Sequence, residues 1–369
     1  MDSIELKKIL AWSLLHKEER LHGRYITYKH IEPIIKNLPE AFKVEKIGHS
    51  YKGIPIHKIA IGTGATKILI WSQMHGNEST GTKAVFDFFK WITDIDNHSD
   101  KISQIVKACT LVFIPMLNPD GAKAYTRVNA QDIDLNRDAV DLIASESKLL
   151  QSVLKEVNPK FCFNLHDQRT IFSVGDKPAT ISFLAPSEDI TRKITESRKI
   201  TMAVISAMFQ TLNKLIPGQI GRYTDEFYPT ATGDNFQKAG HHTILIEAGH
   251  FKDDYDREEV RKFYFIALLS GIKYIACEEN FDAYHPYLSI PNNEKKYLDI
   301  IYKKIFLSDE QSMVDVGIVF KEILKDRQII FKPIIEHVSY LSGYYANQII
   351  DKKGESFKNK STLTSLYEK

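Results

Sequence analysis

The chain has 369 residues, of which 49 are lysine or arginine and 47 are aspartate or glutamate, so its formal net charge is +2. This near balance excludes the strongly basic surface of a nucleic-acid-binding protein, and no nucleic acid is expected as a partner. The length predicts one large domain with an appendage of several tens of residues.

Cysteine usage and the N-terminus bear on the cellular compartment. Cys109, Cys162 and Cys277 lack the spacing of a metal site, and the first two lie in apolar runs where a buried free thiol is usual. The N-terminal residues are too broken by charge for a signal peptide, and no run approaches the roughly 18 apolar residues of a membrane span. We therefore expect a cytoplasmic protein with no membrane partner, and the oligomeric state is left open.

The N-terminal part of the chain predicts a brace followed by the start of a sheet. In chain order, apolar spacing and alternation predict helices over 4–17 and 28–37, a hairpin of strands over 42–47 and 54–61, a buried strand over 68–71, and a helix over 79–92. The first two helices would brace the main sheet. A polar loop through Asp100 would follow the last helix.

Beyond Asp100, strand-like and helix-like segments alternate. In chain order they predict a strand over 111–115, a helix near 141–157, a strand over 161–165, a helix over 187–215, a strand over 243–246 and a helix over 256–276. Such alternation favours an α/β fold, with a mixed, mostly parallel sheet sandwiched by helices. Residues 1–277 are expected to form this domain, with 1–40 as its N-terminal helical brace.

The alternation of apolar strand-like and helix-like segments ends at residue 278. Residues 291–294 predict the start of a short helix, and 314–324 and 329–340 predict two strands joined at Lys325-Asp-Arg327. The polar tail after Asp351 is expected to fray. Residues 278–369 are therefore predicted to form a small α+β C-terminal appendage.

Polar residues follow four of the predicted buried strands. His75, Asn118, His166 and Glu247 each come just after a separate apolar run. If these strands are parallel neighbours, the four side chains converge at the carboxyl edge of the sheet, where open α/β sheets bind ligands. The pattern therefore predicts a functional site at this edge.

His75 and Glu78 lie three residues apart in one tight loop, and with His166 they can share a divalent ion. Three ligands of this His₂Glu type suit zinc and leave one position for water, whose pKa zinc lowers to about 7. A ligating histidine also needs its second nitrogen held, for which Asp134 and Asp167 are candidates. A polar loop with a helix cap is the alternative for the His75–Glu78 pair.

Other charged residues suit a substrate with a carboxylate. Asn136 and Arg137 can grip a carboxylate, and Arg127 can stabilise an oxyanion, although these arginines can instead pair with nearby acids. Glu247 would be partly desolvated at a strand end. Its pKa would then rise, which suits a general base and acid, but a capping or salt-bridged carboxylate is the alternative.

Together these motifs occur in the order of a known family. Along the chain they run His75-x-x-Glu78, Asn118-Pro-Asp-Gly121, Arg127, Asp134-x-Asn136-Arg137, His166 and Glu247. The set resembles the zinc metallocarboxypeptidases related to carboxypeptidase A, which have a His₂Glu catalytic site. The resemblance covers roughly residues 40–275 and implies a catalytic domain within 1–277.

The resemblance implies one zinc ion bound by His75, Glu78 and His166. It further implies that Asp134 holds His75 and that Glu247 acts as general base and acid on a metal-activated water. Peptide hydrolysis would then proceed with this glutamate moving the proton from water to the leaving amine.

The resemblance also assigns the substrate contacts. Arg127 would stabilise the oxyanion, and Asn136 and Arg137 would bind the terminal carboxylate. A mobile tyrosine of the family is best matched by Tyr228, with Tyr223 as a competitor because the spacing fits imperfectly.

Three functions are compatible with this reading. The first is a zinc-dependent metallocarboxypeptidase that hydrolyses the C-terminal peptide bond of a peptide. The second is a zinc-dependent N-acyl amino acid deacylase, because amidohydrolases similar to aspartoacylase also carry His-Gly-Asn-Glu and Asp-Leu-Asn-Arg. The third is a non-catalytic protein that binds peptide termini, against which Glu247 argues. The segment 230–236 resembles the family's specificity loop, and Asp225 and Glu226 could favour a basic group.

Overall fold

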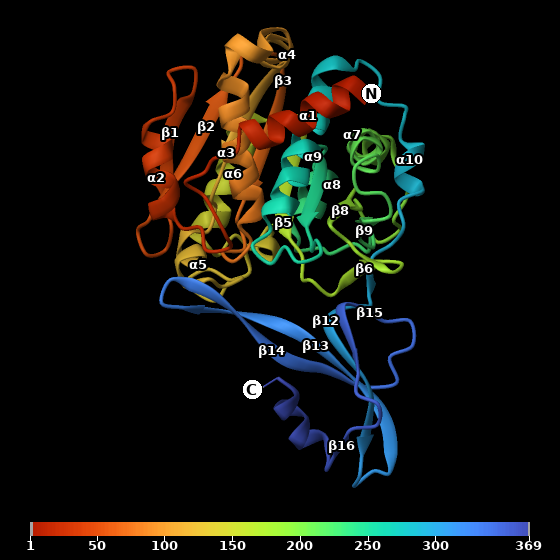
Figure 1. Ribbon diagram of the computed structural model, residues 1–369. Coiled ribbons are helices and arrows are strands. Elements are labelled where there is room, and N and C mark those ends of the chain that lie inside the picture. The colour runs from red at the N-terminus through yellow and green to blue at the C-terminus, as the bar shows by residue number, and fades with distance from the viewer. Residues whose placement is uncertain (1–2, 368–369) are drawn as a thin grey trace.

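Four parallel strands form the centre of the main sheet in the computed structural model, which describes residues 3–367 (Figure 1). They lie side by side in the order β4 (Cys109–Ile114), β3 (Thr66–Ser72), β5 (Phe161–Asp167) and β10 (His242–Ala248). Helices cover both faces of these strands, so their sequences are continuous apolar runs rather than alternating ones. All four were predicted, and the predicted α/β class is confirmed.

Antiparallel strands extend the sheet to eight at both edges. On one side β1 (Lys43–His49) and β2 (Pro55–Ile61) form the predicted hairpin, and β2 pairs with β4. On the other side β8 (Ile181–Leu184) pairs antiparallel with β10, and β9 (Ile220–Arg222) runs parallel to β8. The last two strands were not predicted, because segments of four and three residues carry too little periodicity to be recognised.

Successive residues of the central strands point into two separate cores. Ile68 and Ile70 pack into one core, and Leu69 and Trp71 pack into the other. The helices packed in the first core include α1 (Ser3–Leu15), α2 (Tyr28–Lys36), α3 (Thr80–Thr93), α4 (Ile95–Ala108), α7 (Glu196–Leu212) and α9 (Glu258–Cys277). The second core is closed by α6 (Ser145–Val157) and α8 (Thr232–Lys238).

Two helix predictions were wrong in extent. The polar loop expected through Asp100 is absent because α4 begins at Ile95, and its Ile102 and Ile105 are buried at helical spacing. The helix expected from residue 187 begins only at Glu196, where the Thr195 side chain accepts a hydrogen bond from the backbone of Arg198 and caps it.

The C-terminal residues form a second sheet, below the end of the main sheet where α5 (Pro119–Ala124) lies (Figure 1). Its strand order is β14 (Gln328–Ser339), β13 (Ser312–Lys325), β12 (Tyr297–Leu307) and β15 (Tyr345–Asp351). The hairpin of β13 and β14 turns at the predicted residues. Whether residue 278 begins a separate domain stays a prediction.

Two predictions for this region were wrong. The short helix expected at 291–294 is absent, because after the short helix α10 (His285–Leu288) the chain enters β11 (Glu294–Lys295), which pairs with β6 (Phe172–Val174) next to β7 (Lys177–Pro178). Up to Tyr367, the tail after Asp351 does not fray, since it forms β16 (Ser356–Phe357) and the 3-10 helix η2 (Lys360–Leu366). Leu363 of η2 is fully buried in the core of the second sheet.

Cys109 and Cys162 are buried and unpaired, as expected, and Cys277 is exposed and unpaired. Across residues 3–367, we find no helix that combines the length and the apolar character needed to cross a bilayer.

Candidate metal centre and active site

The loop between β3 and α3, residues 73–79, carries His75 and Glu78 and is fixed by buried backbone contacts. Gly76 packs so closely on the neighbouring segment that a Cβ there would lie 1.9 Å from the carbonyl carbon of Gly121, so only glycine fits. Asn118 donates a hydrogen bond to the Met74 carbonyl over 3.1 Å. The loop conformation is therefore set by residues outside it.

Asn118 supports the site without facing the ligands. Its side-chain oxygen accepts a hydrogen bond from the Gly121 backbone over 2.8 Å, which caps helix α5. The motif Asn118-Pro-Asp-Gly121 is thus the start of a helix, with the proline in the first turn where its missing N–H costs nothing. Of the four strand-end residues, His75, His166 and Glu247 come together, and Asn118 holds the loop behind them.

Three ligand atoms converge at the carboxyl ends of β3 and β5. Glu78 places one oxygen 2.8 Å from Nδ1 of His75 and the other 2.8 Å from Nδ1 of His166. The two Nδ1 atoms lie 3.1 Å apart, and both histidines are only 2% exposed. Zinc binds nitrogen and oxygen ligands at about 2.0–2.2 Å, so atoms spaced in this way fit around one ion. The predicted metal ligands are confirmed.

Asp134 is the residue that orients His75. One Asp134 oxygen lies 3.0 Å from Nε2 of His75, which leaves Nδ1 free to bind metal. Asp134 stays in place because Arg127 donates to its other oxygen and the Asn136 backbone donates to the first, each over 2.9 Å. The other candidate, Asp167, instead accepts from the Thr80 hydroxyl over 2.7 Å.

Glu247 lies directly across from His166, because the two residues are register partners in the parallel pair of β10 and β5. One of its carboxylate oxygens is buried without a hydrogen-bond partner in the described part of the chain. Burial raises the pKa of Glu247 well above its usual range, and the negative charges of Glu78 and Asp167 add to this effect. A carboxyl group that readily holds a proton therefore stands beside the metal ligands.

The comparisons with known proteins agree with this geometry. Residues 27–169 match the family model of the zinc carboxypeptidases, peptidase family M14. This part of the chain is therefore similar to the zinc carboxypeptidases. The matched segment contains all three metal ligands and Asp134 but ends before Glu247, whose placement comes from the fold.

Individual members of this family match only part of the chain. Carboxypeptidase SOL1 of Arabidopsis thaliana is 27% identical over 154 residues, which cover 37% of this chain and 31% of that protein. Carboxypeptidase D of Drosophila melanogaster is 24% identical over 153 residues and is covered to 11%. This chain thus spans less than a third of the length of these curated relatives.

Solved carboxypeptidase structures share the fold at low sequence identity. Carboxypeptidase A of Helicoverpa armigera superposes with a TM-score of 0.56 at 14% identity, covering 75% of this chain and 81% of that one. The metallo-carboxypeptidase of Burkholderia cenocepacia gives a TM-score of 0.53 at 18% identity, covering 66% of each chain. These likenesses establish the architecture of the main sheet and its helices.

Arg127 reaches the metal ligands from the solvent side of the site. Its Nη1 atom lies 3.5 Å from a Glu78 oxygen and 3.3 Å from Nδ1 of His75. The surface ion pair considered for this arginine does occur, with Asp134, but it directs the guanidinium towards the site rather than away from it.

Asn136 and Arg137 lie on the 3-10 helix η1 (Leu135–Arg137), which Asp134 caps. The Asn136 side chain accepts a hydrogen bond from the Thr232 backbone over 3.1 Å and so joins η1 to α8. Arg137 is exposed and stacks over the ring of Tyr228, with 5.3 Å between the guanidinium carbon and the ring centroid. Among the residues that the structure describes, no acid forms an ion pair with Arg137.

The two candidate tyrosines occupy different places. Tyr228 is exposed, and its hydroxyl contacts Glu226 over 3.3 Å. Tyr223 packs its ring on Phe172, and its pKa is raised first by burial and then by the negative charges of Glu247 and Glu78. Of the two tyrosines, Tyr223 is therefore the one whose pKa responds to the charge of Glu247, although the sequence spacing favoured Tyr228.

One buried polar residue near the site escaped the sequence reading. Asn164 lies two positions before His166 on β5 and is fully buried, and neither polar atom of its side chain has a partner among the described residues. It faces Gly233 of α8. The sequence signal for Asn164 was an amide side chain inside an otherwise apolar run. Burying such a group costs free energy unless it finds a hydrogen-bond partner, so its presence indicates a role.

The structure bears on one of the two acids that were expected to favour a basic group. Asp225 is taken up by ion pairs with Arg192 and Arg198, the latter at 2.9 Å. A different acid, Asp234 on α8, has its pKa raised by burial to about 6 and accepts a hydrogen bond from the Tyr228 backbone over 3.1 Å. The 230–236 segment itself thus contributes the acid Asp234, whereas Asp225 is already paired with arginines.

Proposed function

We propose that the chain is a zinc-dependent carboxypeptidase that hydrolyses the last peptide bond of a peptide with a free C-terminal carboxylate. The pairing of His166 with Glu247 carries the proposal, because it sets an unpartnered carboxyl group beside a His₂Glu metal site. A protein that only binds peptide termini has no use for such a group. The names of the matched relatives agree with this assignment.

The metal site suits the chemistry that the reaction needs. His75, His166 and Glu78 would hold one zinc ion, which when bound supplies Lewis-acid activation of a water molecule and of the scissile carbonyl group. Asp134 keeps the His75 ring in the tautomer that offers Nδ1 to the metal.

Glu247 moves the proton. It takes a proton from the attacking water and passes it to the nitrogen of the leaving amine, so that the amine departs neutral. A carboxylate in ordinary solvent holds protons too weakly for the second transfer. The half-buried position of Glu247 at the strand end corrects this, because desolvation raises the pKa of its carboxyl group.

Arg127 stabilises the negative charge that develops on the carbonyl oxygen. Its guanidinium is already oriented by Asp134, so little reorganisation is required when that charge appears. Nη1 stands within 3.5 Å of Glu78, at the edge of the ligand set.

Asn136 and Arg137 select the end of the peptide. Arg137 presents donors that no acid of the described chain occupies, and stacking on Tyr228 holds the guanidinium plane ready for a carboxylate. Binding the terminal carboxylate at a fixed place lets only the last peptide bond reach Glu247. This anchor accounts for an exopeptidase rather than an endopeptidase.

A product analysis tests the proposal directly. The zinc-loaded protein is incubated with a peptide mixture and, separately, with N-acyl amino acids, and the products are identified by mass spectrometry. Release of single C-terminal residues supports the proposal, release of the acyl acid assigns the deacylase instead, and bound zinc with neither product assigns a binding protein. Glu247→Gln serves as the blank, and Glu259→Gln on α9, an exposed acid paired with Lys262, is the matched control.

A further inference from the structure

We propose that the C-terminal sheet is part of the active-site scaffold and that Glu322 on β13 is a positioning residue for the metal loop. Glu322 acts through residues 18–27, here called the strap, which run between that sheet and loop 73–79. The inference deepens the proposed function and rests on the zinc site described for it.

The strap holds the metal loop at both of its ends. At one end Gln73, which has a left-handed φ of 51°, donates a hydrogen bond to the Ile26 carbonyl over 2.9 Å. At the other end the Ser79 hydroxyl donates to the Arg24 carbonyl over 2.7 Å. Both side chains are buried, and both metal ligands of the loop lie between them. A displacement of the strap backbone is therefore transmitted to the loop.

Glu322 holds the strap from the opposite side. Nη2 of Arg24 lies 2.9 Å from Oε1 and 3.1 Å from Oε2 of its carboxylate. The Tyr125 hydroxyl donates a further hydrogen bond to the same carboxylate. The side chain of Arg24 is 5% exposed and that of Glu322 is 23% exposed, so solvent does little to screen the pair. A charge-assisted contact of this kind fixes direction as well as distance.

The carboxylate also balances charge behind the site. Arg257 is fully buried near Arg24, and its Nη1 atom lies 3.2 Å from Asp167, the residue that follows His166. The positive charges of Arg24 and Arg257 are thus balanced by the negative charges of Glu322 and Asp167. Without the charge of Glu322, two buried guanidinium groups would depend on Asp167 alone, which is unfavourable in a poorly solvated region.

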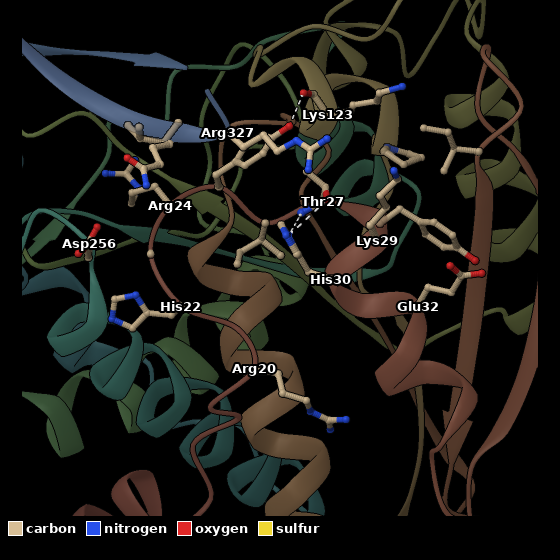
Figure 2. Close-up of a pocket in the computed structure, with 18 of the residues that line it drawn as sticks. Arg20, His22, Arg24, Thr27, Lys29, His30, Glu32, Lys123, Asp256 and Arg327 are labelled. Atoms are coloured by element: carbon tan, nitrogen blue, oxygen red, sulfur yellow. Dashed lines mark hydrogen bonds between the residues drawn. The ribbon is translucent and has the colours of Figure 1, made fainter. Parts of the chain in front are cut away.

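The outer side of the strap has no dense packing to replace these contacts. It lines a cavity of about 930 Å³, which is also lined by Arg327 from the turn between β13 and β14. Figure 2 shows Arg24, Thr27 and Arg327 among the residues around this space. Because side chains do not fill the space, the polar contacts with Glu322 carry more of the restraint on the strap.

The test compares two glutamates of the same sheet. Glu322→Gln keeps the side-chain shape and removes the charge. Glu336→Gln on β14 is the matched control, because Glu336 also reaches the main domain, through an exposed ion pair with Arg169 at 3.3 Å, but bypasses the strap. Zinc affinity is measured by chelator competition without substrate, and kcat and KM are measured separately, at a temperature where circular dichroism shows every variant folded.

We expect Glu322→Gln to weaken zinc binding about tenfold and to lower kcat more than it changes KM, as seen when partners of metal ligands are removed. Glu336→Gln should match the wild type. Tyr125→Phe, which keeps the Arg24 pair, should give a smaller loss in the same direction. Since Glu322 acts through Arg24, the double variant Glu322→Gln with Arg24→Met should lose no more zinc affinity than Arg24→Met alone.

The proposal is overturned if Glu322→Gln binds zinc and turns over substrate as the wild type does. An equal loss in Glu336→Gln, or strictly additive losses in the double variant, would overturn it too, because either result assigns the effect to general docking of the sheet. Zinc affinity is measured without turnover. A weakened zinc site in Glu322→Gln therefore supports this inference even if the wild-type protein cleaves no peptide and the proposed activity fails.

Discussion

His166 on β5 and Glu247 on β10 are register partners in a parallel strand pair, so the backbone of two central strands fixes a metal ligand beside the acid. Neighbouring strands lie about 4.8 Å apart, and this spacing varies little. The remaining ligands, His75 and Glu78, come from a loop that other segments must hold in place. The position of His166 relative to Glu247 is therefore fixed by the sheet backbone, whereas the positions of His75 and Glu78 depend on tertiary contacts.

The first prediction concerns Glu247→Gln. Glutamine keeps the size of the side chain but cannot take up a proton, so we expect kcat to fall by about 10²–10⁴-fold. Zinc affinity should be unchanged, because Glu247 is not among the ligands. Steady-state kinetics and chelator competition on the same preparation give both numbers. Wild-type turnover in this variant would remove Glu247 from the mechanism.

Removing the metal should lower thermal stability. Glu78, His75 and His166 are held close together with little access to water, and a shared cation relieves the crowding of their lone pairs. Free zinc at 1,000 times its dissociation constant would add about 4 kcal/mol to the stability of the folded state. Calorimetry before and after dialysis against a chelator measures the change. His166→Ala should show no zinc-dependent shift, and an equal shift in that variant would place the metal elsewhere.

Arg137→Met should impair recognition of the terminal carboxylate. Hydrogen bonds to charged groups contribute about 1.5–3 kcal/mol, so KM for free-acid peptides should rise about 10- to 100-fold while kcat changes less. The same peptides with an amidated C-terminus provide the comparison, since they offer no carboxylate to lose. If the variant discriminates between the two peptide forms as well as the wild type does, Arg137 is not the anchor.

The same assay distinguishes the roles of Tyr223 and Tyr228. Tyr223→Phe removes the hydroxyl whose pKa is raised in part by the charge of Glu247, and we expect kcat to fall by about tenfold. Tyr228→Phe keeps the ring on which Arg137 stacks and should leave both kinetic constants near wild type. The reverse ranking would favour the assignment made from sequence spacing.

Much of this site was visible in the sequence because its elements are local. Buried parallel strands read as apolar runs, and a polar residue at the end of such a run marks the carboxyl edge of the sheet. His75, His166 and Glu247 were found in this way. The motif order then supplied the roles of Asp134 and Arg137, which no periodicity could have given.

Other features depend on contacts between distant segments and could not be predicted. Without the family resemblance, Asp134 and Asp167 were equal candidates for holding His75, because the choice depends on where η1 packs. Glu322 reads as one more polar residue on an alternating strand, and its partner Arg24 lies 298 positions away. The tertiary fold alone reveals that this exposed-looking glutamate is tied to a buried arginine.

The last prediction concerns acid stability and a cluster away from the metal. Glu258 on α9 pairs with Lys83 at 2.6 Å, with Lys17 at 2.9 Å and with Arg261 at 3.2 Å. Burial raises the pKa of Glu258, but these three cations outweigh burial and lower it to about 2, against 4.5 for the free side chain. The charged form is therefore favoured in the folded state.

A depressed pKa fixes the sign of the pH effect. The contribution of Glu258 to stability is complete above the unfolded pKa of 4.5, and it is lost as the pH falls from there towards 2. The free energy of unfolding, measured in urea at a series of pH values, should show wild type and Glu258→Gln converging across this range. Glu259→Gln, whose exposed carboxylate pairs with Lys262, should differ little from wild type at any pH. A gap between wild type and Glu258→Gln that does not change with pH would mean that glutamine disrupts packing and that the carboxylate charge contributes nothing.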